Sequence, residues 1–341
     1  MPPPRLTRTA TALLATVAAL LATPTHAAPP DKHVLRYCTA REHPKLANRL
    51  NRDIARAVQG RKSTLSFAVW DSGTGLRCAF RPDAHYDSAS IVKVTIMTAT
   101  LLRAQEEGRP LTPWERYNLR LMITESDNTA AANLYDSLGM PFLQYTLRRC
   151  GMFDTFLNPG IGEWGLTQVT AHDEMKQLDV YTVNDTVLSP KNQAYGLRLM
   201  NEVVPAQRWG TPFGAPPGVV VHVKNGWLQR VTEAWRVHSL GIFTSRERSV
   251  PLPAGQGPHH HACGDKAPGQ RLYQMAILTD QDPSMSYGIG TIQRIAWHVH
   301  RDLNDYYEAT GGPVPEYLPD FEADEVGDGS YPRRTAESPD S

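Results

Sequence analysis

Ser90 and Lys93, in the sequence Ser-Ile-Val-Lys, are the first pair of side chains that could do chemistry together. They open a stretch that we expect to be helical through Leu102, and a separation of three residues on a helix places both side chains on one face. A serine hydroxyl becomes a nucleophile when a neighbouring base takes its proton, and a lysine removed from water can have a pKa low enough to be that base. Taken alone, the spacing also fits a helix-capping serine beside a solvated lysine.

A second polar cluster, Ser126-Asp127-Asn128, lies at the turn between two expected helices. Hydroxyl, carboxylate and amide side chains at such a turn are able to bind a reacting group or a neighbouring lysine. The same residue types are common at helix starts, so Asn128 is also a candidate for a simple N-cap.

A third cluster, Lys224-Asn225-Gly226-Trp227, follows the expected strand 218–223. A lysine at the end of a strand can reach a site at the sheet edge, and a glycine there allows close approach of a substrate. The ordinary alternative for Lys-Asn-Gly is a hairpin turn.

In this order, the three clusters resemble the Ser-x-x-Lys, Ser-Asp-Asn and Lys-Thr-Gly motifs of the class A β-lactamases and penicillin-binding proteins. The resemblance covers about residues 40 to 310. It implies a serine hydrolase that forms an acyl-enzyme with a β-lactam or with a peptidoglycan-type peptide ending in a carboxylate. It implies no cofactor and no metal.

The resemblance also implies a role for each polar residue of the motifs. Ser90 would attack the substrate carbonyl, and Lys93 would accept its proton. Ser126 would relay a proton to the departing nitrogen. Asn128 would bind Lys93 and the substrate's side-chain amide, while Lys224 would hold Ser126 and favour the substrate's carboxylate.

The backbone N–H groups of Ser90 and Trp227 would then stabilise the oxyanion, and Gly226 would let substrate approach the strand. Asp127 is interpreted as structural. Asn225 departs from the family pattern, which has Thr or Ser at this position. An amide therefore replaces the hydroxyl that binds the substrate carboxylate, and we expect altered recognition.

Two further departures concern the rim of the cleft. Ser90 and Ser126 are closer in sequence than in a typical class A enzyme, which predicts a missing loop and a more open mouth. The stretch 158–164, before the motif that begins at Thr170, holds one carboxylate, Glu163. Glu163 is either the base that activates the deacylating water or a solvated loop residue. Without such a base, the acyl-enzyme would turn over slowly.

The competing hypothesis is a binding module of the cell wall that has this fold but weak or no catalytic activity. The full set of polar residues argues against a complete loss of chemistry.

The order of the expected elements predicts an α+β fold. A five-stranded antiparallel sheet, formed by both chain ends and flanked by helices, would hold an all-helical lobe inserted in the middle. The site would lie where the lobe meets the sheet. The expected strands are 63–70, 76–80, 218–223, 232–243 and 271–279, and the flanking helices are 44–59 and 284–309. Helix starts in the lobe are expected at Thr112-Pro113, Asn128, Thr170 and Ser189-Pro190, and the helix from Asn128 is expected to stop at Gly139.

The balance of positive and negative charges indicates which classes of binding partner to expect. The 341 residues hold 35 Lys and Arg against 35 Asp and Glu, so no net field attracts nucleic acid or anionic lipid. We expect a monomer that acts on a small molecule or a cell-wall peptide.

The N-terminus has the pattern of an export signal, with Arg5 and Arg8 before an apolar run, 10–22, and small residues ending at Ala27. We expect cleavage near Ala27 and a secreted protein. The apolar run is too short for a membrane anchor, and no Cys stands at the cleavage point for a lipid anchor. The mature domain would be 28–312, followed by a disordered, Pro-rich and acidic tail, 313–341.

Four cysteines remain after cleavage, at positions 38, 78, 150 and 263, which predicts two disulfides in an oxidising compartment. Of the three pairings, we favour Cys38 with Cys78 and Cys150 with Cys263. Metal binding by these cysteines is the alternative, but there is no Cys-x-x-Cys pair. The tract His259-His260-His261 is interpreted as a solvated loop, with a metal site as its alternative.

Overall fold

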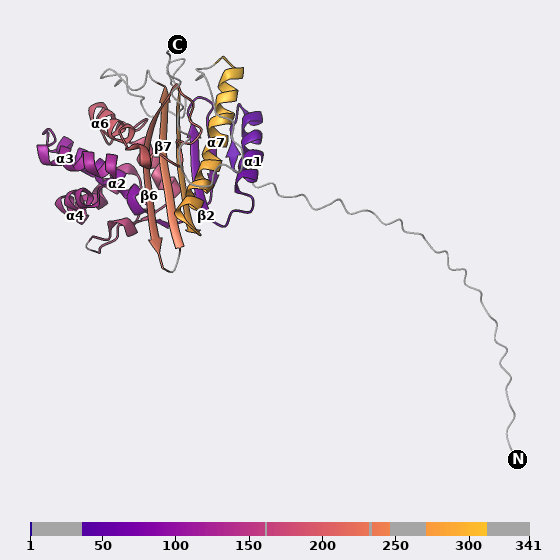
Figure 1. Ribbon diagram of the computed structural model, residues 1–341, viewed down its shortest axis with the longest axis horizontal. Helices are drawn as coiled ribbons and strands as arrows, with labels where there is room; N and C mark the ends of the chain where they lie inside the picture. The colour runs from indigo at the N-terminus through magenta and orange to yellow at the C-terminus, as the bar shows by residue number, and fades with distance from the viewer. Residues whose placement is uncertain (2–35, 161, 232–233, 246–270, 312–341) are drawn as a thin grey trace, which may run out of the picture. The chain divides into compact units, whose positions relative to one another are not determined.

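A six-stranded antiparallel sheet is the centre of the fold (Figure 1). The computed structural model describes Met1 and residues 36–160, 162–231, 234–245 and 271–311. Strands from both ends of the chain share the sheet, as predicted. The expected count of five strands was one too few, because β1 has two residues and is too short to show a periodic pattern. In spatial order the strands are β1 (Cys38–Thr39), β3 (Leu76–Phe80), β2 (Thr64–Asp71), β8 (Leu272–Asp282), β7 (Ala234–Ser245) and β6 (Val219–Arg230).

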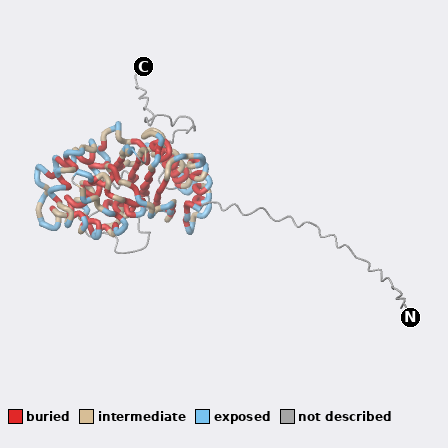
Figure 2. Tube along the Cα trace, turned by 90° about the horizontal axis from the view of Figure 1, so that it is seen from below, coloured by how far each residue is buried: buried red, intermediate tan, exposed pale blue. Residues whose placement is uncertain are grey.

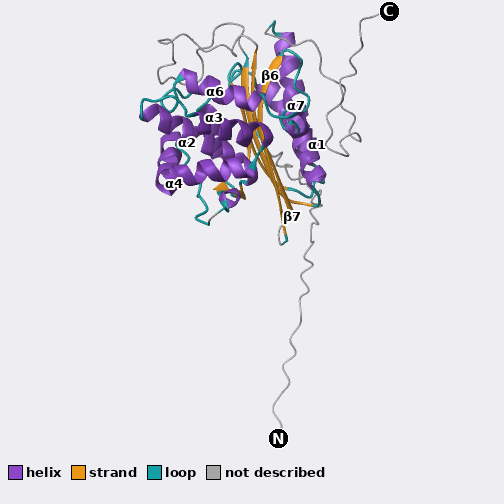
Figure 3. Ribbon diagram, turned by 60° about the vertical axis from the view of Figure 1, so that its left-hand side comes forward, coloured by secondary structure: helices purple, strands orange, loops and turns teal. Residues whose placement is uncertain are grey.

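Helices cover both faces of this sheet (Figures 1 and 3). On one face, α1 (Pro44–Val58) packs beside α7 (Met285–Ala309) over an apolar cluster. On the other face, a separate apolar cluster joins the sheet to the helical lobe. The lobe contains α2 (Val92–Glu106), α3 (Pro113–Arg120), α4 (Asn128–Cys150), α5 (Ala171–Asp179) and α6 (Pro190–Asn201), together with a small sheet of β4 (Tyr86–Asp87) and β5 (Gln168–Val169).

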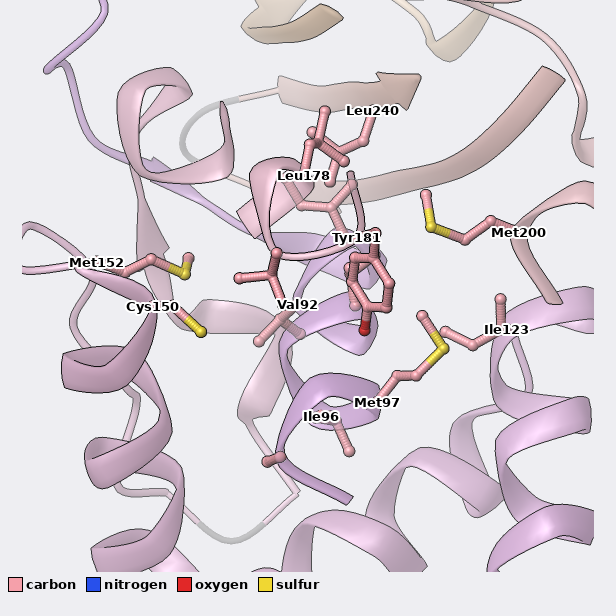
Figure 4. Packing of buried hydrophobic residues seen from close by; sticks show 14 of the residues in the cluster. Val92, Ile96, Met97, Ile123, Cys150, Met152, Leu178, Tyr181, Met200 and Leu240 are labelled. Atoms are coloured by element: carbon pink, nitrogen blue, oxygen red, sulfur yellow. The ribbon is translucent and has the colours of Figure 1, made fainter. Parts of the chain in front are cut away.

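The first helix of the lobe, α2, is buried along nearly its whole length. Figure 4 shows Val92, Ile96 and Met97 of this helix among apolar side chains of other elements, including Tyr181 and Ile123. A helix that is buried on nearly all sides lies inside the core of the protein. The buried residues in Figure 2 accordingly concentrate inside the lobe and along the sheet. The turn 89–91, which contains Ser90 and leads into α2, is therefore attached to a rigid helix.

The helix starts at Thr112 and Thr170 have side-chain caps, as the sequence indicated. Thr112 and Glu115 form a capping box, in which the Glu115 N–H donates to Thr112 Oγ1 at 3.1 Å and the Thr112 N–H donates to Glu115 Oε2 at 2.7 Å. Thr170 Oγ1 accepts from the Asp173 N–H at 3.1 Å, and Ser284 caps α7. Side-chain caps of this kind satisfy backbone N–H groups that have no partner within the helix.

The helix that begins at Asn128 stops at Gly139, as predicted from the sequence, and a second helical segment follows it in α4. Gly139 has a φ of 70°, and the helical path is broken there. The chain resumes helical geometry directly and continues to Cys150. The glycine marks a kink because the next segment also buries an apolar face against the lobe.

Cys38 and Cys78 form a disulfide, as favoured from the sequence, and lie opposite each other in the β1–β3 register. The second predicted disulfide is not formed at Cys150, which is a buried free thiol in the apolar cluster with Met152. Its expected partner, Cys263, lies outside the described residues.

Several predictions lie outside the described residues. These are the export signal before residue 28, the His259–His261 tract and the tail after residue 312. Within the described part of the chain, no helix is long and apolar enough to cross a membrane. Nor do the described residues contain a group of three or more His, Cys, Asp or Glu side chains arranged to hold a metal ion.

Candidate active site

Ser90 lies in a 3-10 turn (Ala89–Ile91) that leads directly into α2. Ala89, just before it, has a φ of 48°, in the left-handed region. For a residue other than glycine this conformation costs about 1–3 kcal/mol, and it persists only where the surroundings enforce it. The Ser88 N–H donates to the Thr167 carbonyl at 2.8 Å and so ties the turn to the lobe. Backbone strain is therefore concentrated next to the candidate nucleophile.

Lys93 is fully buried, and its Nζ contacts uncharged oxygens of the described residues. It lies 3.1 Å from Ser90 Oγ, 3.1 Å from Ser126 Oγ, 2.6 Å from the Ser126 carbonyl and 2.8 Å from Asn128 Oδ1. Burial lowers the pKa of Lys93 to about 7, while the charge of Asp127 acts in the opposite direction. A large fraction of the amine is therefore neutral near pH 7 and able to accept the Ser90 proton.

Ser126 comes just before α4 and has a φ of 58°, a second strained residue at the site. Asp127 is the N-cap of α4, because its Oδ1 accepts from the Ala130 N–H at 2.7 Å. The sequence left open whether Asn128 was the cap. Since Asp127 fills that role, the Asn128 side chain is available to Lys93.

Lys224 enters the site from β6 and is also fully buried. Its Nζ donates to Ser126 Oγ at 2.9 Å and to the Asn225 carbonyl at 2.8 Å. Burial, with a smaller effect from the nearby charge of Lys93, lowers the pKa of Lys224 well below its usual range. The Ser126 hydroxyl therefore lies between two lysine amines, which can pass a proton to it or take one from it.

The sequence predicts that the strand before Lys224 ends at Val223, but the strand is longer. It continues to Arg230, and the Lys-Asn-Gly cluster lies inside it. Alternate residues of a strand face opposite sides. Lys224 therefore faces the lobe, while Asn225 faces away from it.

The Asn225 side chain, for which a substrate contact was predicted, has backbone partners in this structure. Its side-chain amide donates to the carbonyls of Gln207 and Trp209, at 2.9 and 2.8 Å, and the residue is 1% exposed. Asn225 thus joins β6 to the segment before it.

Gly226 lets β6 lie against the nucleophile turn. A Cβ at this position would stand 2.8 Å from the Ser90 nitrogen and 2.9 Å from the Ile91 nitrogen, closer than real Cβ contacts allow. Trp227 follows, half-buried, with its ring centroid 5.8 Å from that of Trp209. The backbones of β6 and the Ser90 turn are therefore adjacent, as an oxyanion site made of their N–H groups requires.

In the loop that contains Glu163, it is the next residue, Trp164, that contacts the candidate site. Glu163 is exposed, whereas the next residue, Trp164, is buried. The centroid of the Trp164 ring lies 4.8 Å from Lys93 Nζ, within the range of a cation–π contact. The sequence analysis missed Trp164. Its only signal was an aromatic residue in a loop expected at the cleft.

Comparison with known proteins gives one family match. Residues 116–250 match the model of a family described as the β-lactamase enzyme family. This range holds Ser126, Asn128 and Lys224 but begins after Ser90. Among curated proteins, the lipoprotein LppW of Mycobacterium tuberculosis is 27% identical over 194 residues, and that of Mycobacterium bovis matches equally. The match spans 55% of this chain and 62% of the length of LppW.

Solved structures share the whole fold at low identity. The structure of PBP-A gives a TM-score of 0.59 at 18% identity, covering 76% of this chain and 96% of PBP-A. A class A β-lactamase from Bacteroides cellulosilyticus gives 0.59 at 15%, covering 76% and 98%. A β-lactamase from Sphaerobacter thermophilus gives 0.57 at 19%, covering 77% and 97%. The described elements thus have the fold of these proteins.

Proposed function

We propose that this chain, whose resemblance to the class A β-lactamase and penicillin-binding-protein family is confirmed by fold and by the family match, is an exported serine hydrolase. It would transfer an acyl group from a β-lactam or a peptidoglycan-type peptide to Ser90. The observation that supports this most is the position of Lys93 Nζ, within hydrogen-bond distance of both Ser90 Oγ and Ser126 Oγ.

Acylation begins with proton transfer from the Ser90 hydroxyl to neutral Lys93 as Ser90 Oγ attacks the substrate carbonyl carbon. The negative charge moves to the carbonyl oxygen, where the backbone N–H groups of Ser90 and Trp227 would bind it. Gly226 supports this step because it allows β6 to lie close enough to the turn.

Collapse of the intermediate breaks the carbon–nitrogen bond, and the departing nitrogen takes the hydroxyl proton of Ser126. Ser126 regains a proton from Lys93, which carries the one removed from Ser90, so no proton is gained or lost. Lys224 holds the Ser126 hydroxyl in place through its 2.9 Å contact. One lysine thus acts as base and the other as an orienting group.

Recognition of the substrate carboxylate would rest on Lys224 and Ser126. Asn225 contributes its backbone carbonyl to Lys224, but its amide is committed to Gln207 and Trp209. A hydroxyl at this position is the family pattern, so binding of carboxylate substrates would be weaker here than in the enzymes that have it.

Slow deacylation is part of the proposal. Hydrolysis of the acyl ester needs a base that activates a water molecule, and such help is typically worth 100- to 10,000-fold. Exposed Glu163 is the candidate from the sequence, but buried Trp164 is the residue beside Lys93. An indole cannot accept a proton from water. The ester would therefore accumulate.

The alternative, a cell-wall binding module without turnover, explains the site less well. Ala89 and Ser126 adopt strained conformations, and Lys93 and Lys224 are buried without an ion pair to a carboxylate among the described residues. Each feature lowers stability. A module that only binds gains nothing from two amines with lowered pKa values, whereas an acyl-transfer site does.

Export is supported by the Cys38–Cys78 disulfide, since disulfides persist mainly in oxidising compartments. The curated relative LppW is described as a lipoprotein. We propose that this chain is likewise exported.

Labelling with a fluorescent penicillin tests the proposal, and a PBP-A mutant has been solved as an acyl-enzyme complex with penicillin G. The wild type is expected to retain the label on a denaturing gel, and Ser90→Ala is expected to retain none. Ser137→Ala, a serine on the exposed side of α4, is the matched control and should label like the wild type. A wild type that remains unlabelled would favour the binding module.

A further inference from the structure

Asp87 lies three residues before Ser90, in β4, and its side chain is 12% exposed. Oδ2 of Asp87 is 2.8 Å from Arg236 Nε and 3.4 Å from Arg230 Nη1. Its other oxygen, Oδ1, accepts from Gln168 Nε2 at 2.5 Å. One carboxylate thus contacts β5, the end of β6 and the start of β7.

The backbone of Asp87 is held as well. His238 Nε2 is 2.8 Å from the Asp87 carbonyl, and burial lowers the pKa of His238 to about 4. The imidazole is therefore neutral at pH 7, and its Nε2–H is the donor. His238 is the register partner of Gly226, the residue that lies against the Ser90 turn.

These contacts bear on the strain at the nucleophile. Ala89 stays in the left-handed region only if both ends of the segment are fixed. Gly226 of β6 closes against the Ser90 end. The Asp87 contacts fix the other end, and Arg236, 4% exposed, is a buried charge that pairs with it.

We propose that Asp87 is a positioning residue for the nucleophile. By joining three strands to the segment before Ser90, it keeps Ala89 strained and holds Ser90 Oγ at its 3.1 Å distance from Lys93. Asp87 acts through Ser90 and does not itself take part in the reaction. The inference rests on the proposed function, in which Ser90 is acylated.

The test compares Asp87→Asn with Asp53→Asn. Asp53 is a matched control because its side chain is 10% exposed and pairs with Arg56 and Arg301, but in α1, on the other face of the sheet. For each variant, labelling by a fluorescent penicillin at several concentrations separates the acylation rate constant from the dissociation constant of the non-covalent complex. Thermal unfolding gives stability.

Asp87→Asn is expected to lower the acylation rate constant about tenfold or more, because small displacements of a reacting atom carry penalties of this size. Its dissociation constant should change by less than about twofold, because the variant acts on geometry and not on uniform substrate binding. Asp53→Asn should lower the unfolding temperature and leave acylation within about twofold of the wild type.

Two more variants keep the inference testable if Asp87→Asn folds poorly. Arg230→Gln removes a 38%-exposed partner and leaves Arg236 paired, so it should fold and acylate about two- to threefold more slowly. Adding Arg236→Gln to Asp87→Asn removes the buried charge that Asp87 no longer neutralises and should recover part of the lost rate.

Wild-type labelling is examined first. If wild-type Ser90 takes no label, the proposed function fails and this inference fails with it. If the wild type labels but folded Asp87→Asn and Arg230→Gln acylate at the wild-type rate, this inference alone is wrong. It is also wrong if Asp53→Asn slows acylation as much as Asp87→Asn, because the effect would then follow general stability.

Discussion

Two sites on opposite faces of the central sheet differ in the partners of their buried cations. Between α1 and α7, Arg301 forms ion pairs with the carboxylates of Asp53 and Asp302. At the candidate site, Lys93 and Lys224 are fully buried, and among the described residues their amines donate to uncharged oxygens. Burial without a carboxylate partner among the described residues lowers the pKa values of Lys93 and Lys224. In the proposed function, the first site stabilises the fold and the second carries out proton transfer.

The largest effect on acylation is expected from a substitution at Ser90. Ser90→Ala should abolish acylation by penicillin and leave the unfolding temperature within a few degrees of the wild type, because the residue is only half-buried at a helix start. Gel labelling and thermal unfolding measure the two quantities. Covalent labelling of the alanine variant at the wild-type rate would show that another residue is the nucleophile.

Lys93→Met addresses the unpaired charge directly. Loss of the general base should slow acylation roughly 100- to 10,000-fold. Stability should stay unchanged or rise, because a buried cation is replaced by an apolar side chain of similar length.

Arg301→Met on the opposite face is the control for Lys93→Met, with the reverse pattern: lower stability and unchanged acylation. If Lys93→Met lowers the free energy of unfolding in urea as much as Arg301→Met does, the proposed difference between the two buried cations is wrong.

The pH dependence should show the same contrast. Lys93 has a pKa of about 7 in the folded protein, so the acylation rate constant should fall about tenfold per pH unit below that value. The folded state binds fewer protons at Lys93 than the unfolded chain, whose lysine pKa is about 10.4. Stability should therefore rise with pH from about 7 to about 10, with Lys224 acting in the same direction.

Rate and unfolding temperature measured from pH 5.5 to 9 test this dependence. In Lys93→Met, the acylation rate and the unfolding temperature should both depend less on pH than in the wild type. In Arg301→Met, both should depend on pH as in the wild type. An acylation rate that is flat between pH 6 and 8 would mean that Lys93 is not the titrating base.

The smallest effect is expected at Glu163. With a chromogenic cephalosporin, the wild type should give a burst followed by a slow steady state, and Glu163→Gln should change the slow rate by less than about tenfold. The reason is that exposed Glu163 does not face Lys93, whereas Trp164 does. Rapid linear hydrolysis that falls by three or more decades in Glu163→Gln would identify Glu163 as the deacylating base.

Local sequence patterns were enough to predict which residues lie together in much of the candidate site. Ser90 and Lys93 are neighbours on one helical path, and Ser126 and Asn128 share one helix start. The capping box at Thr112 likewise involves residues three apart. Such features depend on interactions within a single turn, which propensity and spacing describe well.

Features that depend on distant partners were not predictable in this way. Strand β6 continues past Val223 because β7 pairs with it as far as Arg230, and the orientation of Asn225 follows from that pairing. The roles of Trp164 and Asp87 depend on Lys93 and on side chains of three other strands. No spacing along the chain records these contacts, since they form only when the lobe meets the sheet.

Time-resolved mass spectrometry after mixing the protein with penicillin G tests the central claim most directly. The prediction is that the mass of one intact penicillin is added to the wild-type protein at pH 7.5, maps to the peptide containing Ser90 and decays slowly. The same mixture with Lys93→Met should show the adduct only after a much longer time. An adduct on another residue, or none on a folded wild type, would contradict the assignment of Ser90 as a nucleophile activated by Lys93.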